Sequence, residues 1–104
     1  MTQHMPTSVT AWEDSVHARL IDDLKLPSEI TDEILGRALI GHKTYGTYLG
    51  VGNPGRDPVQ DLRDQLLDSL IYAWERLLAT EDNTYRAIAG HLLMALELMD
   101  QPME

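Results

Sequence analysis

The sequence lacks cysteine and phenylalanine altogether, and each absence narrows what the protein can be. Without cysteine it has no disulfide framework and no thiolate chemistry. Without phenylalanine, the bulk of any core comes from leucine, isoleucine, methionine and the two tryptophans, Trp12 and Trp74. No apolar run approaches the length of a membrane span, and residues 1–10 lack the hydrophobic segment of a signal peptide. We therefore expect a cytoplasmic protein that has no membrane partner.

Positive charge is also scarce, because 8 lysines and arginines stand against 17 aspartates and glutamates, for a net charge of −9. No basic patch is available to contact phosphates, so direct nucleic-acid binding is not expected. The charge suits a protein whose acidic groups repel one another or coordinate cations. The glycine-lysine-threonine run of a phosphate-binding P-loop is missing as well.

Helical periodicity dominates the sequence, and neither a strand pattern nor an internal repeat is found. The 104 residues suit one small domain. We predict a disordered N-terminal arm over residues 1–9 and a single domain over residues 10–104. Helices are predicted over about residues 11–25, 29–42, 58–79 and 84–99, with a long glycine-rich loop over residues 43–57. The predicted fold is all-α, a four-helix antiparallel bundle-like domain with this loop before its third helix.

Local signals mark where three of these helices begin. Thr10 and Glu13 have the spacing of a capping box for the first helix, and Ser28, after Pro27, can cap the second. The third helix has the sharpest start, with an N-cap, a proline at the first helical position and a residue able to close a capping box, at Asp57, Pro58 and Gln60.

The predicted third helix has two contrasting sides on a helical projection. One broad side is apolar and consists of Val59, Leu62, Leu66, Leu67, Leu70, Ile71, Trp74, Leu77 and Leu78. The opposite side carries Asp61, Asp64, Gln65, Asp68, Tyr72 and Glu75. Asp64 and Asp68 are like charges one turn apart, which destabilise a helix by roughly a few tenths of a kcal/mol unless a cation lies nearby. This face is either solvated, as most charged helix faces are, or holds a divalent cation.

A second acidic face is predicted on the second helix. Glu29 and Glu33 lie one turn apart there, with Asp32 nearby and Gly36 beside them. We expect this face to converge with the aspartates of the third helix. Glycine in a helix lowers its stability by about 1 kcal/mol relative to alanine. Gly36 therefore either allows another backbone or a ligand to approach closely, or has no special role near the end of the helix.

A resemblance extends over residues 37–78. Along this stretch lie Tyr45-Gly46-Thr47, Leu49, Gly55-Arg56-Asp57, Asp61, Gln65-Leu66-Leu67-Asp68 and Tyr72. The combination resembles the short MazG-like proteins carried by phages, which belong to the all-α nucleoside triphosphate pyrophosphohydrolase superfamily. The family's metal helix carries glutamate-x-x-aspartate where this chain has Gln65 and Asp68, and its lysine directly precedes the tyrosine, whereas here Thr44 separates Lys43 from Tyr45.

The resemblance implies hydrolysis of a nucleoside triphosphate to the monophosphate and pyrophosphate, with Mg²⁺ or Mn²⁺, in the cytosol of a bacterial or phage-infected cell. It implies metal ligands among Asp61, Asp64, Asp68, Glu29 and Glu33, with Asp32 as an alternative on the second helix, and of these Asp64, Asp68 and Glu33 would be catalytic. Substrate would be bound by Lys43 and Arg56 at the phosphates and by Tyr45 or Tyr48 at the base, and Tyr72 is a further substrate-binding residue.

Two other functions remain open. Because Gln65 replaces a carboxylate, the same fold could be a catalytically degenerate module that binds a nucleotide or a partner. The negative charge also allows an acidic phage protein that occupies a basic surface of a host protein.

The last helix points to self-association. Tyr85, Ile88, Ala89, Leu92, Leu96 and Met99 form one apolar stripe, while Ala87, Met94 and Leu98 fall opposite. A helix that is apolar on both sides is usually covered on both. We therefore expect a homodimer or a larger homo-oligomer, with His91 in the interface or the core.

Overall fold

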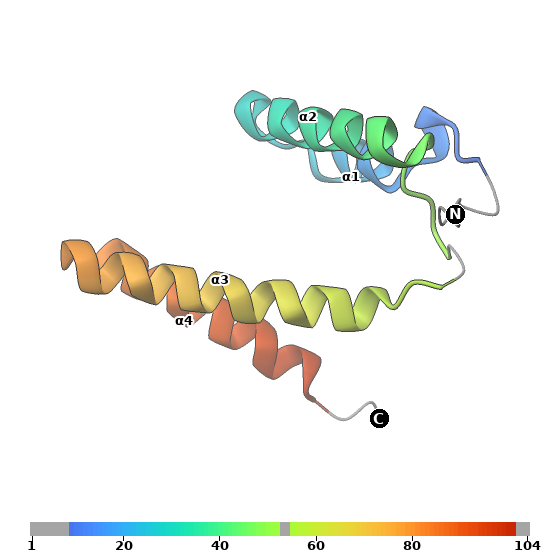
Figure 1. Cartoon of the computed structure of the whole chain (residues 1–104). Coiled ribbons are helices and arrows are strands. Elements are labelled where there is room, and N and C mark those ends of the chain that lie inside the picture. Colours follow the sequence, from blue (N-terminus) through green and yellow to red (C-terminus); the bar gives the residue numbers. More distant parts are fainter. Residues whose placement is uncertain (1–8, 53–54, 102–104) are drawn as a thin grey trace. The chain divides into compact units, whose positions relative to one another are not determined.

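The structure is a computed structural model that describes residues 9–52 and 55–101. These residues form a 3-10 turn and four α-helices: η1 (Trp12–Asp14), α1 (Val16–Leu24), α2 (Ser28–Tyr45), α3 (Pro58–Thr80) and α4 (Asn83–Met99) (Figure 1). No strand occurs in them, which confirms the all-α prediction. The predicted arm lies outside the described residues except for Val9, which is exposed. None of the described helices is both long and apolar enough to cross a membrane.

The chain divides into two compact units, Met1–Arg56 and Asp57–Glu104, which we call unit 1 and unit 2. Unit 1 contains η1, α1 and α2, and unit 2 contains α3 and α4. Each is described by itself below. The expected bundle of four helices in one domain therefore stays a prediction.

In unit 1 the first α-helix begins later than the sequence predicts. The chain makes a 3-10 turn, and Ser15 caps α1 by accepting a hydrogen bond from the Ala18 N–H at 3.1 Å. The Ser15 hydroxyl donates to the Trp12 carbonyl at 2.7 Å. Thr10 is not the cap, because Ala11 is extended and a 3-10 turn separates it from α1, which Ser15 caps. The Thr10 N–H donates to the Thr47 hydroxyl at 2.7 Å, a partner 37 residues away.

Helix α2 is longer at both ends than predicted. Ser28 is its first residue and not its cap, since the N-cap position belongs to Pro27, which makes no side-chain hydrogen bond. At the other end the helix continues to Tyr45 and stops at Gly46, whose φ of 75° is left-handed and whose N–H donates to the His42 carbonyl. Glycine adopts this conformation without the steric penalty of a side chain, which explains why the helix ends there.

Small residues let α1 and α2 approach each other. The buried apolar side chains of these two helices are alanines, Ala18 on α1 and Ala38 on α2. Larger apolar side chains lie around them, and the half-buried ones include Leu20, Ile21 and Ile34. The core of unit 1 is therefore small.

Helix α3 begins as predicted. The Asp57 side chain accepts a hydrogen bond from the Gln60 N–H at 3.1 Å, and Pro58 is the first helical residue. The Gln60 side-chain amide nitrogen donates to Asp64 Oδ1 at 2.8 Å, one turn further along the helix. Helix α4 starts after a second aspartate cap, Asp82, which accepts from the Thr84 N–H at 2.9 Å.

Unit 2 is an α3–α4 helix pair around a narrow apolar core. Ala73 and Leu77 of α3 and Ala89 and Leu96 of α4 are buried there. Half-buried side chains extend this core along both helices at Leu66, Leu70, Tyr85, Leu92 and Met99. The broad apolar side predicted for α3 is therefore divided, since only part of it meets α4.

The remainder of that apolar side is exposed, at Val59, Leu62, Leu67, Ile71, Trp74 and Leu78. Cationic side chains support the helix pair at its edges. The Arg76 guanidinium lies 5.5 Å from the centre of the Tyr85 ring, and that of Arg86 lies 5.3 Å from the Trp74 ring. Arg63 forms an ion pair with Asp100, which fastens the first half of α3 to the end of α4.

Candidate functional site

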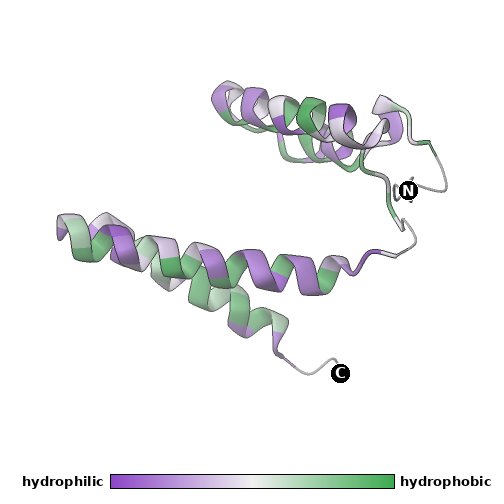
Figure 2. Ribbon diagram, in the orientation of Figure 1, coloured by the Kyte–Doolittle hydropathy of each residue, from purple (hydrophilic) through white to green (hydrophobic). Residues whose placement is uncertain are grey.

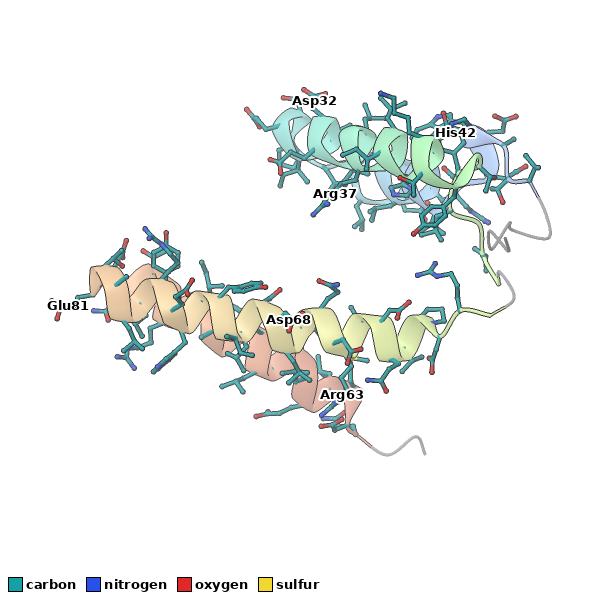
Figure 3. All side chains as sticks on the ribbon, viewed as in Figure 1. Asp32, Arg37, His42, Arg63, Asp68 and Glu81 are labelled. Atoms are coloured by element: carbon teal, nitrogen blue, oxygen red, sulfur yellow. The ribbon has the colours of Figure 1, made fainter. Side chains whose placement is uncertain are left out.

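The acidic face predicted for the third helix lies on α3, and all of its members are exposed. Asp61, Asp64 and Asp68 follow one another at intervals of one turn, and Tyr72 continues the row with an exposed fraction of 64%. Figure 3 labels Asp68 midway along the helix. Three carboxylates and one aromatic ring are therefore presented together on one regular element.

Few partners offset the negative charge of these carboxylates. Asp64 accepts its hydrogen bond from the Gln60 amide, which carries no charge. Among the described residues, no hydrogen bond or ion pair reaches the Asp68 carboxylate. Asp61 does interact with a neighbour. The repulsion between Asp64 and Asp68 thus persists along the middle of the row.

The acids predicted on the second helix lie in the other unit. Glu29 and Glu33 are exposed in the first half of α2, as is Asp32, which Figure 3 labels there. A Cβ atom built on Gly36 would meet no atom within 4 Å, so nothing in the described residues packs closely against this glycine. Because α2 and α3 belong to different units, convergence of the two acidic faces stays a prediction.

Three of the residues predicted to bind substrate, Lys43, Tyr45 and Arg56, lie in the sequence on either side of the connection between α2 and α3. Lys43 and Tyr45 belong to the last turn of α2, and Tyr45 is 62% exposed. Arg56 is exposed in the loop just before α3 and already interacts with a neighbour. Tyr48 is less available, because its half-buried ring packs against two others. The ring centres lie 5.3 Å away for Trp12 and 4.5 Å away for His42.

The tyrosine-glycine-threonine turn has a structural role that the sequence did not indicate. Thr47 is 7% exposed, and its hydroxyl accepts from the Thr10 N–H and donates to the Thr10 carbonyl at 3.3 Å. Nearby, the Val16 N–H donates to the Leu49 carbonyl at 2.8 Å. Gly50 permits this contact, because a Cβ atom there would collide with the Thr10 hydroxyl. We call this arrangement the threonine clip.

The donor set is a partial fit for a divalent metal ion. Within either unit, the described residues include no ready-made group of three or more acidic or histidine side chains that could hold one. A preformed cage is not what Mg²⁺ requires, since it keeps several waters and is often bound by one or two carboxylates together with substrate phosphates. Asp64 and Asp68, one turn apart and exposed, match that smaller requirement.

Comparisons of the chain with models of known protein families, with curated proteins and with solved structures give no match. The resemblance to MazG-like proteins thus rests on the motifs of residues 37–78 alone.

Proposed function

We propose that the protein is a metal-dependent nucleoside triphosphate pyrophosphohydrolase, which releases pyrophosphate and a nucleoside monophosphate. The observation that carries this proposal is the row of exposed aspartates on α3. Asp64 and Asp68 remain one turn apart, and the hydrogen bond that Asp64 accepts comes from a neutral amide. A surface that keeps this repulsion is suited to binding a cation.

Asp64 and Asp68 would hold Mg²⁺ or Mn²⁺, with Asp61 beside them. Glu33 and Glu29 are the proposed second set of ligands. When bound, the metal would screen the triphosphate charge and polarise the phosphorus for attack by water.

The remaining roles follow from charge and exposure. Lys43 and Arg56 would neutralise phosphate oxygens, as cationic side chains do in phosphate sites. The exposed rings of Tyr45 and Tyr72 would stack on the base. Thr47 would act indirectly, by fixing the chain between Tyr45 and Arg56.

The direct test measures pyrophosphate release from a panel of ribo- and deoxyribonucleoside triphosphates with Mg²⁺ or Mn²⁺. We expect Asp68→Asn to abolish metal-dependent release while leaving helix content unchanged, because the side chain is exposed and makes no internal hydrogen bond. Glu75→Gln is the matched control. It removes one negative charge from an exposed position of the same helix, outside the proposed ligand set, and should retain activity. Equal activity of wild type and Asp68→Asn would refute the site.

Gln65 favours one competing function, a degenerate module that binds a nucleotide without turning it over. It occupies the place of a carboxylate in the family motif and is exposed on α3. Gln65→Glu separates the two. An enzyme weakened by the amide should gain metal affinity or rate, whereas a binding module should still fail to release pyrophosphate. If calorimetric titration with Mg²⁺ is identical for wild type, Gln65→Glu and Asp68→Asn, the metal site does not exist. A pull-down that recovers a basic host protein would then favour the acidic interaction protein.

A further inference from the structure

Three aromatic rings of unit 1 form a connected cluster, and one of them is exposed. The Trp12 and Tyr48 rings meet edge to face, with their centres 5.3 Å apart. The His42 ring packs against Tyr48 in a tilted arrangement, with a distance of 4.5 Å between the ring centres. Trp12 and Tyr48 are half-buried, whereas His42 is exposed near the C-terminal end of α2, where Figure 3 labels it. We call these three residues the aromatic cluster.

Backbone contacts on both sides of Tyr48 hold the aromatic cluster in place. Thr47, directly before it, is fixed by the two hydrogen bonds of the threonine clip. Leu49, directly after it, accepts a hydrogen bond from the first N–H of α1 at 2.8 Å. The His42 carbonyl accepts from the Gly46 N–H, which secures the last turn of α2. The exposed histidine ring therefore packs on a support whose backbone is fixed before any ligand arrives.

We propose that the His42 ring is the stacking platform for the base of a nucleoside triphosphate. Histidine is one of the side chains on which nucleobases stack, and this contact accepts any base, because every base has an aromatic face. The ligand class is therefore a purine or pyrimidine nucleotide. Hydrophilic segments recur along α2 (Figure 2), and Lys43, the residue after His42, is one of the two cations proposed for the phosphates.

This inference rests on the proposed function and adds a residue to its site. Tyr45 and Tyr72, the rings assigned to the base in that site, are 62% and 64% exposed and contact no other ring among the described residues. Ordering such a side chain on binding costs conformational entropy, and a ring that already packs against a neighbour avoids part of that cost. Tyr45 follows His42 by three residues, so the two rings occupy neighbouring positions on the surface of α2.

The test is calorimetric titration of the full chain in the presence of Mg²⁺, with probes that cannot release pyrophosphate. The probes are the α,β-methylene analogues of ATP and UTP, and tripolyphosphate, which lacks a base, is the comparison. His42→Ala should weaken the binding of both analogues about tenfold, as expected for the loss of one stacked base, and should leave the binding of tripolyphosphate unchanged. His91→Ala, at an exposed histidine of α4, is the matched control and should bind all three probes as wild type does.

An aromatic replacement separates stacking from other roles of the histidine. His42→Phe keeps a planar ring without ring nitrogens and should bind both analogues as wild type does. His42→Gln keeps hydrogen-bonding groups without the ring and should bind as weakly as His42→Ala. Because the side chain is exposed, the circular dichroism of all three variants should match that of wild type.

Four results would overturn the stacking platform: a wild type that binds neither analogue, a His42→Ala variant that binds them as wild type does, a loss that extends to tripolyphosphate, or recovery with glutamine and not with phenylalanine. Failure of the proposed hydrolysis has a different signature. If wild type binds both analogues and His42→Ala does so more weakly, but neither ATP nor UTP yields pyrophosphate, the hydrolysis alone is refuted.

Discussion

Thr47 offers the sharpest test of the structure, because it belongs to the motif that resembles the MazG-like proteins, and the structure assigns it to the threonine clip. Thr47→Val keeps the shape of the side chain and removes the hydroxyl. The Thr10 N–H, which donates to that hydroxyl at 2.7 Å, then loses its partner in a part-buried place. Leaving a buried donor unsatisfied costs about 1–3 kcal/mol, so we expect unit 1 to lose about 2 kcal/mol of stability.

Urea unfolding can isolate this effect, since each unit contains one tryptophan, Trp12 in unit 1 and Trp74 in unit 2. In a Trp74→Phe background, fluorescence reports on Trp12, whose ring packs against Tyr48, the residue after Thr47. With a urea dependence of about 1 kcal/mol per M for a protein of this size, Thr47→Val should lower the unfolding midpoint by about 2 M.

Thr47→Ser is the control, because it keeps the hydroxyl and removes one methyl group. It should cost about 0.8 kcal/mol, the transfer free energy of one buried carbon, and so fall between wild type and the valine variant. If Thr47→Val unfolds at the wild-type midpoint, or if serine costs as much as valine, the clip does not stabilise unit 1 and the reasoning fails.

Three further changes test other parts of the fold. Gly50→Ala should destabilise unit 1 by about 1–3 kcal/mol through its collision with the Thr10 hydroxyl, and Thr10→Ala in the same chain should recover part of that loss in urea titrations. Ser15→Ala should lower the free energy of unfolding by about 2 kcal/mol by removing the α1 cap, whereas Ser28→Ala should change it by less than about 0.5 kcal/mol. Equal effects would contradict the assignment of the cap. The hydrogen bond from the Thr84 N–H lowers the pKa of Asp82 below its ordinary 3.8, so the stability that this carboxylate contributes is complete above that value and is lost as pH falls through the lowered pKa. Asp82→Asn should therefore flatten the acid side of the stability profile, as thermal unfolding against pH would show.

Most of the helical structure could be predicted from the sequence because its signals are local. Asp57 and Pro58 start α3 through contacts within one turn, and the structure begins the helix where those residues predict. The acidic row of α3 follows from the helical period alone, so the exposure of Asp64 and Asp68 was also within reach. Their partners were not, because the spacing of Gln60 and Asp64 permits the hydrogen bond from the Gln60 amide nitrogen without requiring it.

The tertiary structure decided what depends on residues distant in the chain. Thr10 has the local pattern of a helix cap, but it is bonded to Thr47, 37 residues away, and α1 begins only after Ser15. The apolar side of α3 also depends on a distant segment. The helical period determines which residues of α3 lie on that side, but the position of α4 determines which of them are buried. A capping pattern or an apolar stripe indicates which local structures a segment can form by itself. Which of them it forms depends on the free energy of its contacts with another segment, and that segment lies far away in the sequence.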